Sequence, residues 1–293
     1  MTEAPFTLVG IRPEAAPAPA ARTKKETPMA SVVILALIVL GCIFAGAISR
    51  KDPAYLDLAN YTNAPCREFL FGTDTLGRDI FACIWYGGRV SLSIGFLATA
   101  ISTAVAVVFG AVSGAASERV DTLLMRLTEV LLSVPELLLV LFFQAVWGQP
   151  SVLSISVIIG LTSWFSIAKV VRTEVRQIRS SEYVIASRCM GGSFLHILTQ
   201  HLAPNFLSAI MFMVVMNVRG AIVAESTLSF LGMGLPLDVI SWGSMLSLSE
   251  RALMTKAWWM ILIPGAFLVT LFICLTNVGN WLRKSANRKE SSL

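Results

Sequence analysis

The chain has 293 residues, of which 55% are apolar and 14% are charged, and its formal net charge at pH 7 is +5. Together with a mean hydropathy of +0.73, this composition excludes an ordinary soluble globular domain and indicates a membrane protein. An excess of Lys and Arg is typical of the cytoplasmic loops of such proteins, so it requires no nucleic-acid partner.

Six apolar segments are each long enough to cross a hydrocarbon layer of about 30 Å at about 1.5 Å per residue. They show no strand-like alternation, and every backbone amide in lipid needs an internal hydrogen bond, so helices are favoured over a barrel. We therefore expect an all-α polytopic membrane protein with six transmembrane helices and both termini on one side. The expected spans are residues 29–49, 92–114, 125–147, 151–171, 205–231 and 257–279.

The N-terminal residues 1–28 are rich in Pro and Ala and carry mixed charges, which predicts a disordered cytoplasmic tail. Residues 29–49 are expected to follow as the first transmembrane anchor. Ala45, Gly46 and Ala47 resemble a signal-peptidase site, so a cleaved leader is the alternative. A tail of 28 residues before the apolar run is, however, long for a signal peptide.

The segment 50–91 is expected to be extracytoplasmic and to contain a short interfacial helix. Thr73 and Asp74 are favourable N-cap residues, and Gly87 with Gly88 would end the helix before the second span. Apolar residues recur along this segment at helical spacing; they are Ile80, Phe81, Ile84 and Trp85. One side of the helix could therefore lie in the headgroup region.

Charged residues inside the spans cost about 2.5–3.5 kcal/mol each near the bilayer centre, so each needs a partner or a role. Arg126 and Glu129 lie one turn apart and are predicted to form a local ion pair. Arg219 and Glu225 in the fifth span are six residues apart, about 240° around a helix, so they are expected to find separate partners. Together with Asn217, they either line a translocation path or pin helices together.

The polar segment 172–204 separates the fourth and fifth spans. Ser181 can cap a short helix whose first turn carries Glu182, and Gly191 permits the positive φ that ends a helix. Pro204 suits the first turn of the fifth span. Such a helix would project from the membrane, where a soluble partner could push or pull it.

The distribution of Lys and Arg between the loops predicts the orientation. With the N-terminus inside, the inner side holds fourteen: Arg12, Arg22, Lys24, Lys25, Arg119, Lys169, Arg172, Arg176, Arg179, Arg188, Arg283, Lys284, Arg288 and Lys289. The outer side holds seven basic residues: Arg50, Lys51, Arg67, Arg78, Arg89, Arg251 and Lys256. Seven acidic residues on the same side balance their charge. This bias places both tails and the 172–204 loop in the cytoplasm. Trp242, Trp258 and Trp259 are predicted to be interfacial anchors.

The sequence contains no motif for chemistry. It lacks the GxxxxGK[ST] loop that cradles phosphates, and no catalytic triad, paired-carboxylate or metalloprotease spacing stands out. The five cysteines form no CxxC pair, which indicates neither a disulfide framework nor a metal site. His196 and His201 are interpreted as solvated side chains rather than metal ligands. We therefore expect no catalytic residues, no enzyme activity and no cofactor on this chain.

Several strings match one known family in order and spacing. GTDTLGRD at residues 72–79 is followed by GGRVSL at residues 87–92. The later matches are Asp121, Met125, Arg126, Pro135, Glu182, Tyr183, Val184, Ala186, Gly191, Pro204, Asn205, Glu225, 228–232, Gly234, Trp242, Gly243, Trp259, Pro264, Gly265, Asn277 and Gly279. Over about residues 70–283 the chain resembles the peptide/nickel class of permeases of ATP-binding-cassette (ABC) importers.

The resemblance implies a type I ABC importer permease fold, with a permease core at residues 92–281 and a basic cytoplasmic tail at residues 282–293. It implies that the 181–205 loop couples to an ATPase through a set of residues: Glu182, Tyr183, Ala186, Ser187 and Gly191. Three positions depart from the family's loop motif: Ile185 stands where that motif has Glu, Ser187 replaces an Ala, and Ala203 replaces the Leu before Pro204. Near the C-terminus, Asn280 follows Gly279 where the family has Asp.

The resemblance also implies the assembly. A second homologous permease would complete the membrane core, two ABC ATPase subunits would bind ATP and Mg²⁺, and an extracytoplasmic solute-binding protein would deliver a peptide, nickel or a metal chelate. The assembly would be located in a bacterial inner membrane, where the permease would contact membrane lipid. An ion-coupled secondary transporter is the alternative, since it would explain the charges within spans, although not the short Gly-terminated loop. A structural membrane scaffold is a third class, and it would tolerate loss of Glu225 or Gly191.

Overall fold

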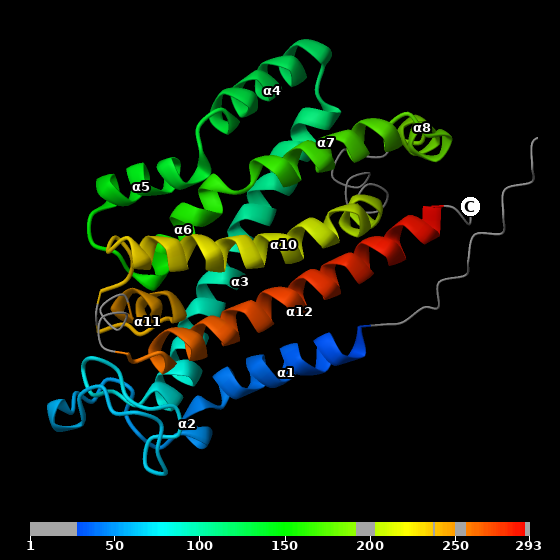
Figure 1. Ribbon diagram of the computed structural model, residues 1–293. Coiled ribbons are helices and arrows are strands. Elements are labelled where there is room, and N and C mark those ends of the chain that lie inside the picture. Colours follow the sequence, from blue (N-terminus) through cyan, green and yellow to red (C-terminus); the bar gives the residue numbers. More distant parts are fainter. Residues whose placement is uncertain (1–27, 192–202, 237, 250–255, 291–293) are drawn as a thin grey trace, which may run out of the picture.

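The computed structural model describes residues 28–191, 203–236, 238–249 and 256–290, and these are helical over most of their length (Figure 1). The helices are α1 (Met29–Ile43), α2 (Ala45–Ile48), η1 (Leu58–Asn60), α3 (Ile80–Ala115), α4 (Glu118–Leu132), α5 (Glu136–Trp147), α6 (Val152–Thr162), α7 (Phe165–Ile178), α8 (Glu182–Cys189), α10 (Ala203–Phe230), α11 (Trp242–Ser249) and α12 (Trp259–Glu290). Extended pairing in the described part is an isolated bridge between Thr73 and Asp79. The predicted all-α class is confirmed.

Three of the described helices, α3, α10 and α12, are each long and apolar enough to cross a membrane. Two bent pairs, α4 with α5 and α6 with α7, satisfy the same length and composition requirement when each pair is taken together. The first expected span is divided at Phe44 into the 15-residue α1 and the short α2. Every expected span therefore corresponds to a helix or to a pair of helices.

The third and fourth expected spans are not the single helices that the sequence predicted. The axes of α4 and α5 meet at 86°, and those of α6 and α7 at 46°. At the first break, Pro135 precedes α5 as its N-cap, and a proline disfavours helical geometry in the residue before it. Each bent pair therefore has helix ends in the middle of the segment, where a straight transmembrane helix would be continuous.

The helix α3 is the central element of the fold. It has 36 residues and contributes to each of the three clusters of buried apolar side chains in the described part of the chain. The helices α1, α12 and α10 run side by side, and α3 crosses them (Figure 1). The α7 and α6 helices pack along the other part of α3. The protein is thus assembled around one long helix.

The expected break at Gly87 and Gly88 is wrong, because α3 runs through both glycines. Its N-cap is Asp79, whose side chain accepts a hydrogen bond from the Phe81 amide at 3.0 Å, so Thr73 and Asp74 do not cap it. A Cβ placed on Gly88 would overlap the ring of Trp242 and the sulfur of Cys42. The glycine pair therefore permits close packing of α1 and α11 on α3 rather than a turn.

Two of the three predicted tryptophan anchors are buried. Trp242 is fully buried, and its indole N–H donates to the Ile84 carbonyl at 2.9 Å. Trp259 donates in the same way to the Thr73 carbonyl at 3.1 Å. These bonds attach the 50–79 segment and α11 to the bundle. Trp258 is exposed and stays a predicted anchor.

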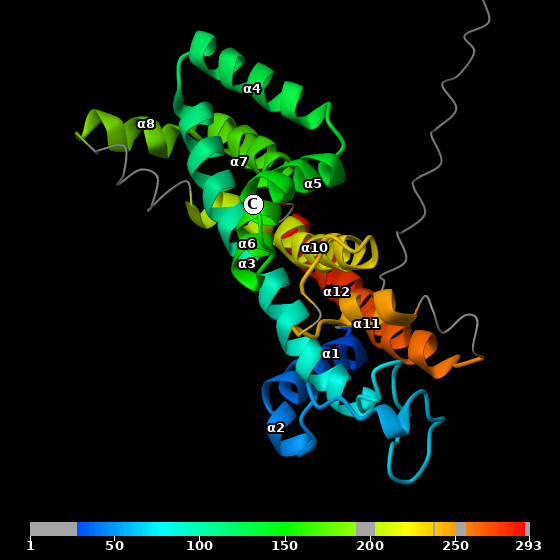
Figure 2. The same ribbon diagram turned by 90° about the vertical axis from the view of Figure 1, so that its left-hand side faces the viewer.

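The ends of the described chain lie together. The start of α1, the end of α12 and the helix α8 occupy one end of the molecule, whereas the 50–79 segment lies at the other (Figures 1 and 2). This arrangement agrees with six crossings that leave both termini on one side. The helix α12 also continues through residues 282–290 of the expected basic tail. Residues 1–27 of the expected N-terminal tail lie outside the described residues.

Candidate functional site

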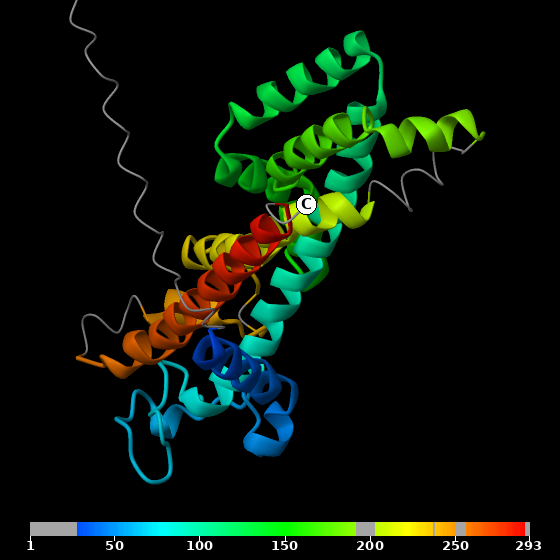
Figure 3. The ribbon, with the colours of Figure 1, turned by 90° about the vertical axis from the view of Figure 1, so that its right-hand side faces the viewer.

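The helix α8 projects from the end of the molecule, beyond α7 (Figure 3). Val184 and Ser187 are buried toward the bundle, whereas Ile185 is 50% exposed and Met190, just after the helix, is 83% exposed. The expected coupling residues Glu182, Tyr183, Ala186 and Ser187 all belong to this helix. The helix therefore presents an outer face to solvent at the place where the sequence predicted a docking loop.

The two ends of α8 lie at Ser181 and Gly191. Gly191 has φ +82°, which confirms the predicted left-handed residue, and no described residue beyond its chain neighbours lies within 4 Å of the place where its Cβ would be. Ser181 directly precedes α8, and its carbonyl accepts the Ile185 N–H at 3.1 Å, while its hydroxyl donates to the Ile178 carbonyl at 2.6 Å at the end of α7. Capping of α8 by the Ser181 side chain stays a prediction. The following residues 192–202, which include His196 and His201, lie outside the described residues.

A second polar site surrounds Glu225 on α10, whose side chain is fully buried. The carboxylate accepts hydrogen bonds from the hydroxyls of Ser241 at 2.6 Å, Ser229 at 2.9 Å and Ser91 at 3.4 Å. The backbone N–H of Trp242 donates to the Ser91 oxygen at 3.1 Å. The Glu225 side chain therefore joins α10 to α3 and to the beginning of α11.

The other two polar residues predicted on α10 have partners on neighbouring helices. Asn217 Nδ2 donates to Ser102 Oγ of α3 at 2.7 Å, and Arg219 Nη1 donates to Thr276 Oγ1 of α12 at 3.3 Å. Arg219 and Glu225 thus have separate partners, as their angular separation predicts. Both Asn217 and Arg219 are only half-buried. In this conformation the bonds hold helices together, and the lining of a path by these residues stays a prediction.

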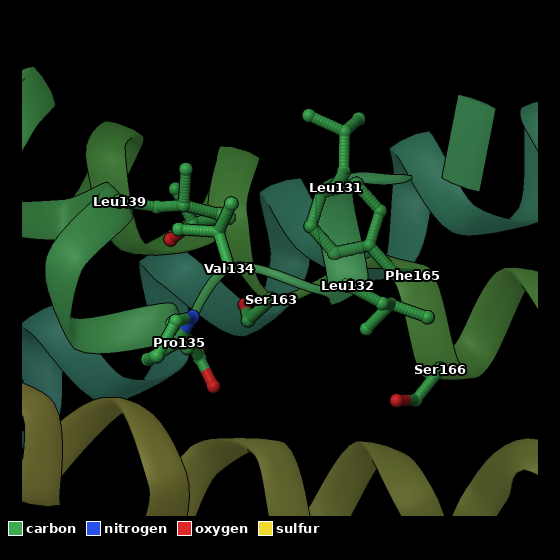
Figure 4. Close-up of a pocket in the computed structure, with 10 residues that line it drawn as sticks. Leu131, Leu132, Val134, Pro135, Leu139, Ser163, Phe165 and Ser166 are labelled. Atoms are coloured by element: carbon green, nitrogen blue, oxygen red, sulfur yellow. The ribbon is translucent and has the colours of Figure 1, made fainter. Parts of the chain in front are cut away.

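A cavity of about 170 Å³ lies where the two bent pairs of helices meet (Figure 4). Its wall includes Pro135 at the first break, and Ser163 and Phe165 at the second. The Ser163 hydroxyl donates to the Ile159 carbonyl at 2.8 Å, within its own helix, so it is not free for a ligand. Ligand pockets usually measure about 300–1,000 Å³. The cavity is too small to enclose a peptide.

Metal ligation has no candidate in the described ranges, since they contain no group of three or more His, Cys, Asp or Glu placed to hold an ion. The five cysteines are free thiols, of which Cys66 and Cys189 are exposed and Cys42, Cys83 and Cys274 are buried. The predicted absence of a cofactor on this chain stays a prediction.

Comparison with known proteins now decides the family. The family described as binding-protein-dependent transport system inner membrane component matches residues 106–288, which include α8 and Glu225. The chain is 35% identical over 261 residues to the oligopeptide transport system permease protein OppC of Bacillus subtilis, covering 89% of the chain and 85% of that protein. It is 33% identical over 266 residues to the dipeptide transport system permease protein DppC of the same organism, covering 91% and 83%.

The chain belongs to this family of permeases. The permease is therefore a multi-pass inner-membrane subunit of an ABC importer, and it is a transport subunit rather than an enzyme. Membership in a binding-protein-dependent system implies ATPase and binding-protein partners in general. The ion-coupled secondary transporter is not favoured.

Several residues at the polar sites of the permease were missed by reasoning from sequence. Ser91 lies 134 positions before Glu225, and Ser241 lies 16 positions after it, so no local spacing connects them to the carboxylate. Asp121 matched the family's pattern, yet its partner Arg172 is 51 positions away. A buried carboxylate in an apolar span signals that hydroxyl or guanidinium partners exist, but it does not say which they are.

Proposed function

We propose that this permease forms half of the translocation pathway of an importer of peptides. The support for the cargo is that the two relatives described above carry oligopeptide and dipeptide transport in their names. Nickel or a metal chelate is the other cargo that the sequence resemblance implied. A second homologous permease completes the pathway, and an extracytoplasmic solute-binding protein delivers the cargo to it.

Each permease docks on one of two ATPase subunits, this one through its cytoplasmic loop 181–205, and the observation that carries this proposal is the projecting helix α8. Its exposed Ile185 and the adjacent Met190 offer apolar contact area to a partner, and Gly191 follows the helix with a positive φ. ATP and Mg²⁺ bind on the ATPase subunits. When their nucleotide sites close, α8 moves, and because only residues 179–181 separate it from α7, the movement passes into the bundle.

The orientation follows from the same proposal, with both termini and α8 on the cytoplasmic side. Fourteen basic residues on that side against seven on the other support it. So does the position of α8 at the same end of the molecule as the start of α1 and the end of α12 (Figure 1). The 50–79 segment is then extracytoplasmic and faces the binding protein.

Within the pathway, we assign Asn217, Arg219 and Glu225 to the lining or support of the passage. Asn217 and Arg219 are only half-buried, so part of each side chain is left for contact with cargo. Glu225 holds α10 against α3 beside them.

Transport by the complete complex in proteoliposomes tests the function. We expect ATP-dependent uptake of radiolabelled dialanine or pentaalanine that requires the binding protein and is absent when the permease is omitted. Uptake of radioactive Ni²⁺ in place of both peptides would replace the peptide proposal with the metal one. Uptake that persists without the ATPase subunits would contradict the importer mechanism itself.

A further inference from the structure

The buried carboxylate of Asp121, in the first turn of α4, lies at the centre of an ionic cluster whose two arginines, Arg172 and Arg176, are partly exposed. Asp121 is 2% exposed, and it accepts hydrogen bonds from Arg172 Nε at 2.5 Å, Arg176 Nη1 at 2.6 Å and Ser113 Oγ at 2.7 Å. Arg172 Nη2 makes a further short bond to the second carboxylate oxygen. Arg172 thus grips both oxygens in the forked geometry that only a guanidinium provides.

The cluster clasps the end of α7 to the corner between α3 and α4. Arg172 and Arg176 are one turn apart on α7, and Arg179 lies on nearly the same face a turn later. Arg179 Nη1 donates to the carbonyls of Gly114 and Ala116, at 3.0 Å and 3.2 Å, where α3 ends. The chain enters α8 directly after this residue. The clasp is therefore the last fixed point of the bundle before the projecting helix.

The helix α4 has few other attachments near this end. Its buried residues are Asp121, Met125 and Thr128. On its opposite side Leu123 and Val130 are 62% and 66% exposed. The helix α7, in contrast, packs against α3 over a continuous apolar surface that includes Val171 and Val175. A movement of α7 reaches α3 through that surface, but it reaches the beginning of α4 through Asp121.

We propose that Asp121 is a positioning residue that transmits the movement of α7 and α8 to α4. This inference rests on the proposed function, since it assumes that an ATPase moves α8. With the clasp intact, α4 follows α7 as one body, and the break before α5 takes up the change in angle. Without the clasp, the ATPase still docks on α8, but α4 no longer moves together with α7.

The variant Asp121→Asn tests the clasp in the complete transporter, because it keeps the shape of the side chain and removes its charge. Arg172→Lys is the second variant; it keeps the positive charge and removes the fork. Arg126→Gln is the matched control, because Arg126 forms an exposed ion pair with Glu129 on the same helix at 3.5 Å, and such surface pairs contribute little. Dialanine and pentaalanine are the transport probes.

The distance between α4 and α7 is the measurement that separates transmission of movement from a merely structural role of Asp121. Spin labels at the exposed positions Val130 and Gln177, in a background without native cysteines, report it by pulsed electron resonance with and without vanadate-trapped ATP. For the wild type and Arg126→Gln we expect one narrow distance that both states share. For Asp121→Asn and Arg172→Lys we expect a broad or state-dependent distance, with about tenfold lower uptake and ATP hydrolysis within about twofold of wild type.

A narrow, unchanged distance in either clasp variant would overturn the proposal, whatever the transport rate. If Asp121→Asn fails to assemble, Arg172→Lys decides, since it leaves no uncompensated carboxylate. If the wild-type complex transports neither peptide, the proposed function fails, while the distance between α4 and α7 still decides the role of Asp121.

Discussion

The Ser241 hydroxyl donates a hydrogen bond of 2.6 Å to the Glu225 carboxylate, and both side chains are fully buried. Ser241 immediately precedes α11, a short helix that no apolar span accounts for, whereas Glu225 belongs to α10. A buried carboxylate in a membrane protein is costly unless its acceptors are satisfied, and here three hydroxyls satisfy them. The bond therefore fixes α11 to the bundle.

Replacing Glu225 by Leu should lower the stability and yield of the assembled complex, because three hydroxyl donors lose their acceptor. A buried donor left without a partner costs about 1–3 kcal/mol. Glu225→Gln should do the same more mildly, since the amide oxygen still accepts. Ser229→Ala, which removes one donor, is the control. Complex yield, melting temperature and peptide uptake are measured together; normal yield with slow uptake for Glu225→Gln would favour the pathway-lining role.

Gly191→Val should leave the helices inserted but weaken ATPase docking or uncouple hydrolysis from uptake. The residue has φ +82°, where a Cβ costs about 1 kcal/mol and a β-branched side chain more. No described residue beyond its chain neighbours lies within 4 Å of its Cβ position, so the expected effect is one of backbone conformation. Gly220→Ala is the matched control, because Gly220 is also uncrowded but lies within α10 without a positive φ. Equal coupling in both variants would remove this loop as the transmission element.

The two exposed native cysteines can decide the topology. Cys66 lies in the 50–79 segment and Cys189 ends α8, and the other three thiols are buried. Two variants are compared in intact cells, one that retains only Cys66 and one that retains only Cys189 of the two exposed cysteines. An impermeant maleimide should label Cys66 from outside, and it should label Cys189 only after the membrane is opened. The opposite pattern would invert the orientation.

Asp74→Asn should unfold part of the 50–79 segment. Arg78 is 3% exposed, and its Nε donates to the Asp74 carboxylate at 2.7 Å. Breaking a buried pair from one side costs about 3–5 kcal/mol, because the remaining charge stays buried. Asp52→Asn is the control, since Asp52 is exposed. Protease added outside spheroplasts should cut the Asp74 variant faster and the Asp52 variant at the wild-type rate.

The buried pair also shows how far the sequence could predict this fold. The string that contains Asp74 and Arg78 indicated the right family. Asp74 itself was expected to cap a helix, whereas it stabilises a turn through its bonds to Arg78. Apolar runs predicted where helices occur because each run must cross the same thickness of lipid. The position of Gly191 predicted its backbone conformation because that preference is local.

Contacts between distant segments were not predictable from the sequence. An apolar run has the same composition whether it faces lipid or protein, so hydropathy could not distinguish the buried Trp242 from an interfacial tryptophan. The same limit applies to Gly88, whose meaning depends on Trp242 more than 150 positions away. Pro135 lies at the break before α5, but the sequence analysis expected one straight span there, and the 86° angle depends on how α4 and α5 pack.

The 36 residues of α3 give it a length of about 54 Å, well beyond the hydrocarbon layer of about 30 Å. One end carries the 50–79 segment, and the other is clasped to α7 just before α8. The helix α3 is continuous over this length and contains no proline, and its Gly87 and Gly88 are packed against neighbouring residues that include Ser241, Cys42 and Trp242. A tilt of α3 that begins at one end must therefore displace its opposite end. The face toward the binding protein and the face toward the ATPase are thus mechanically connected through a single helix.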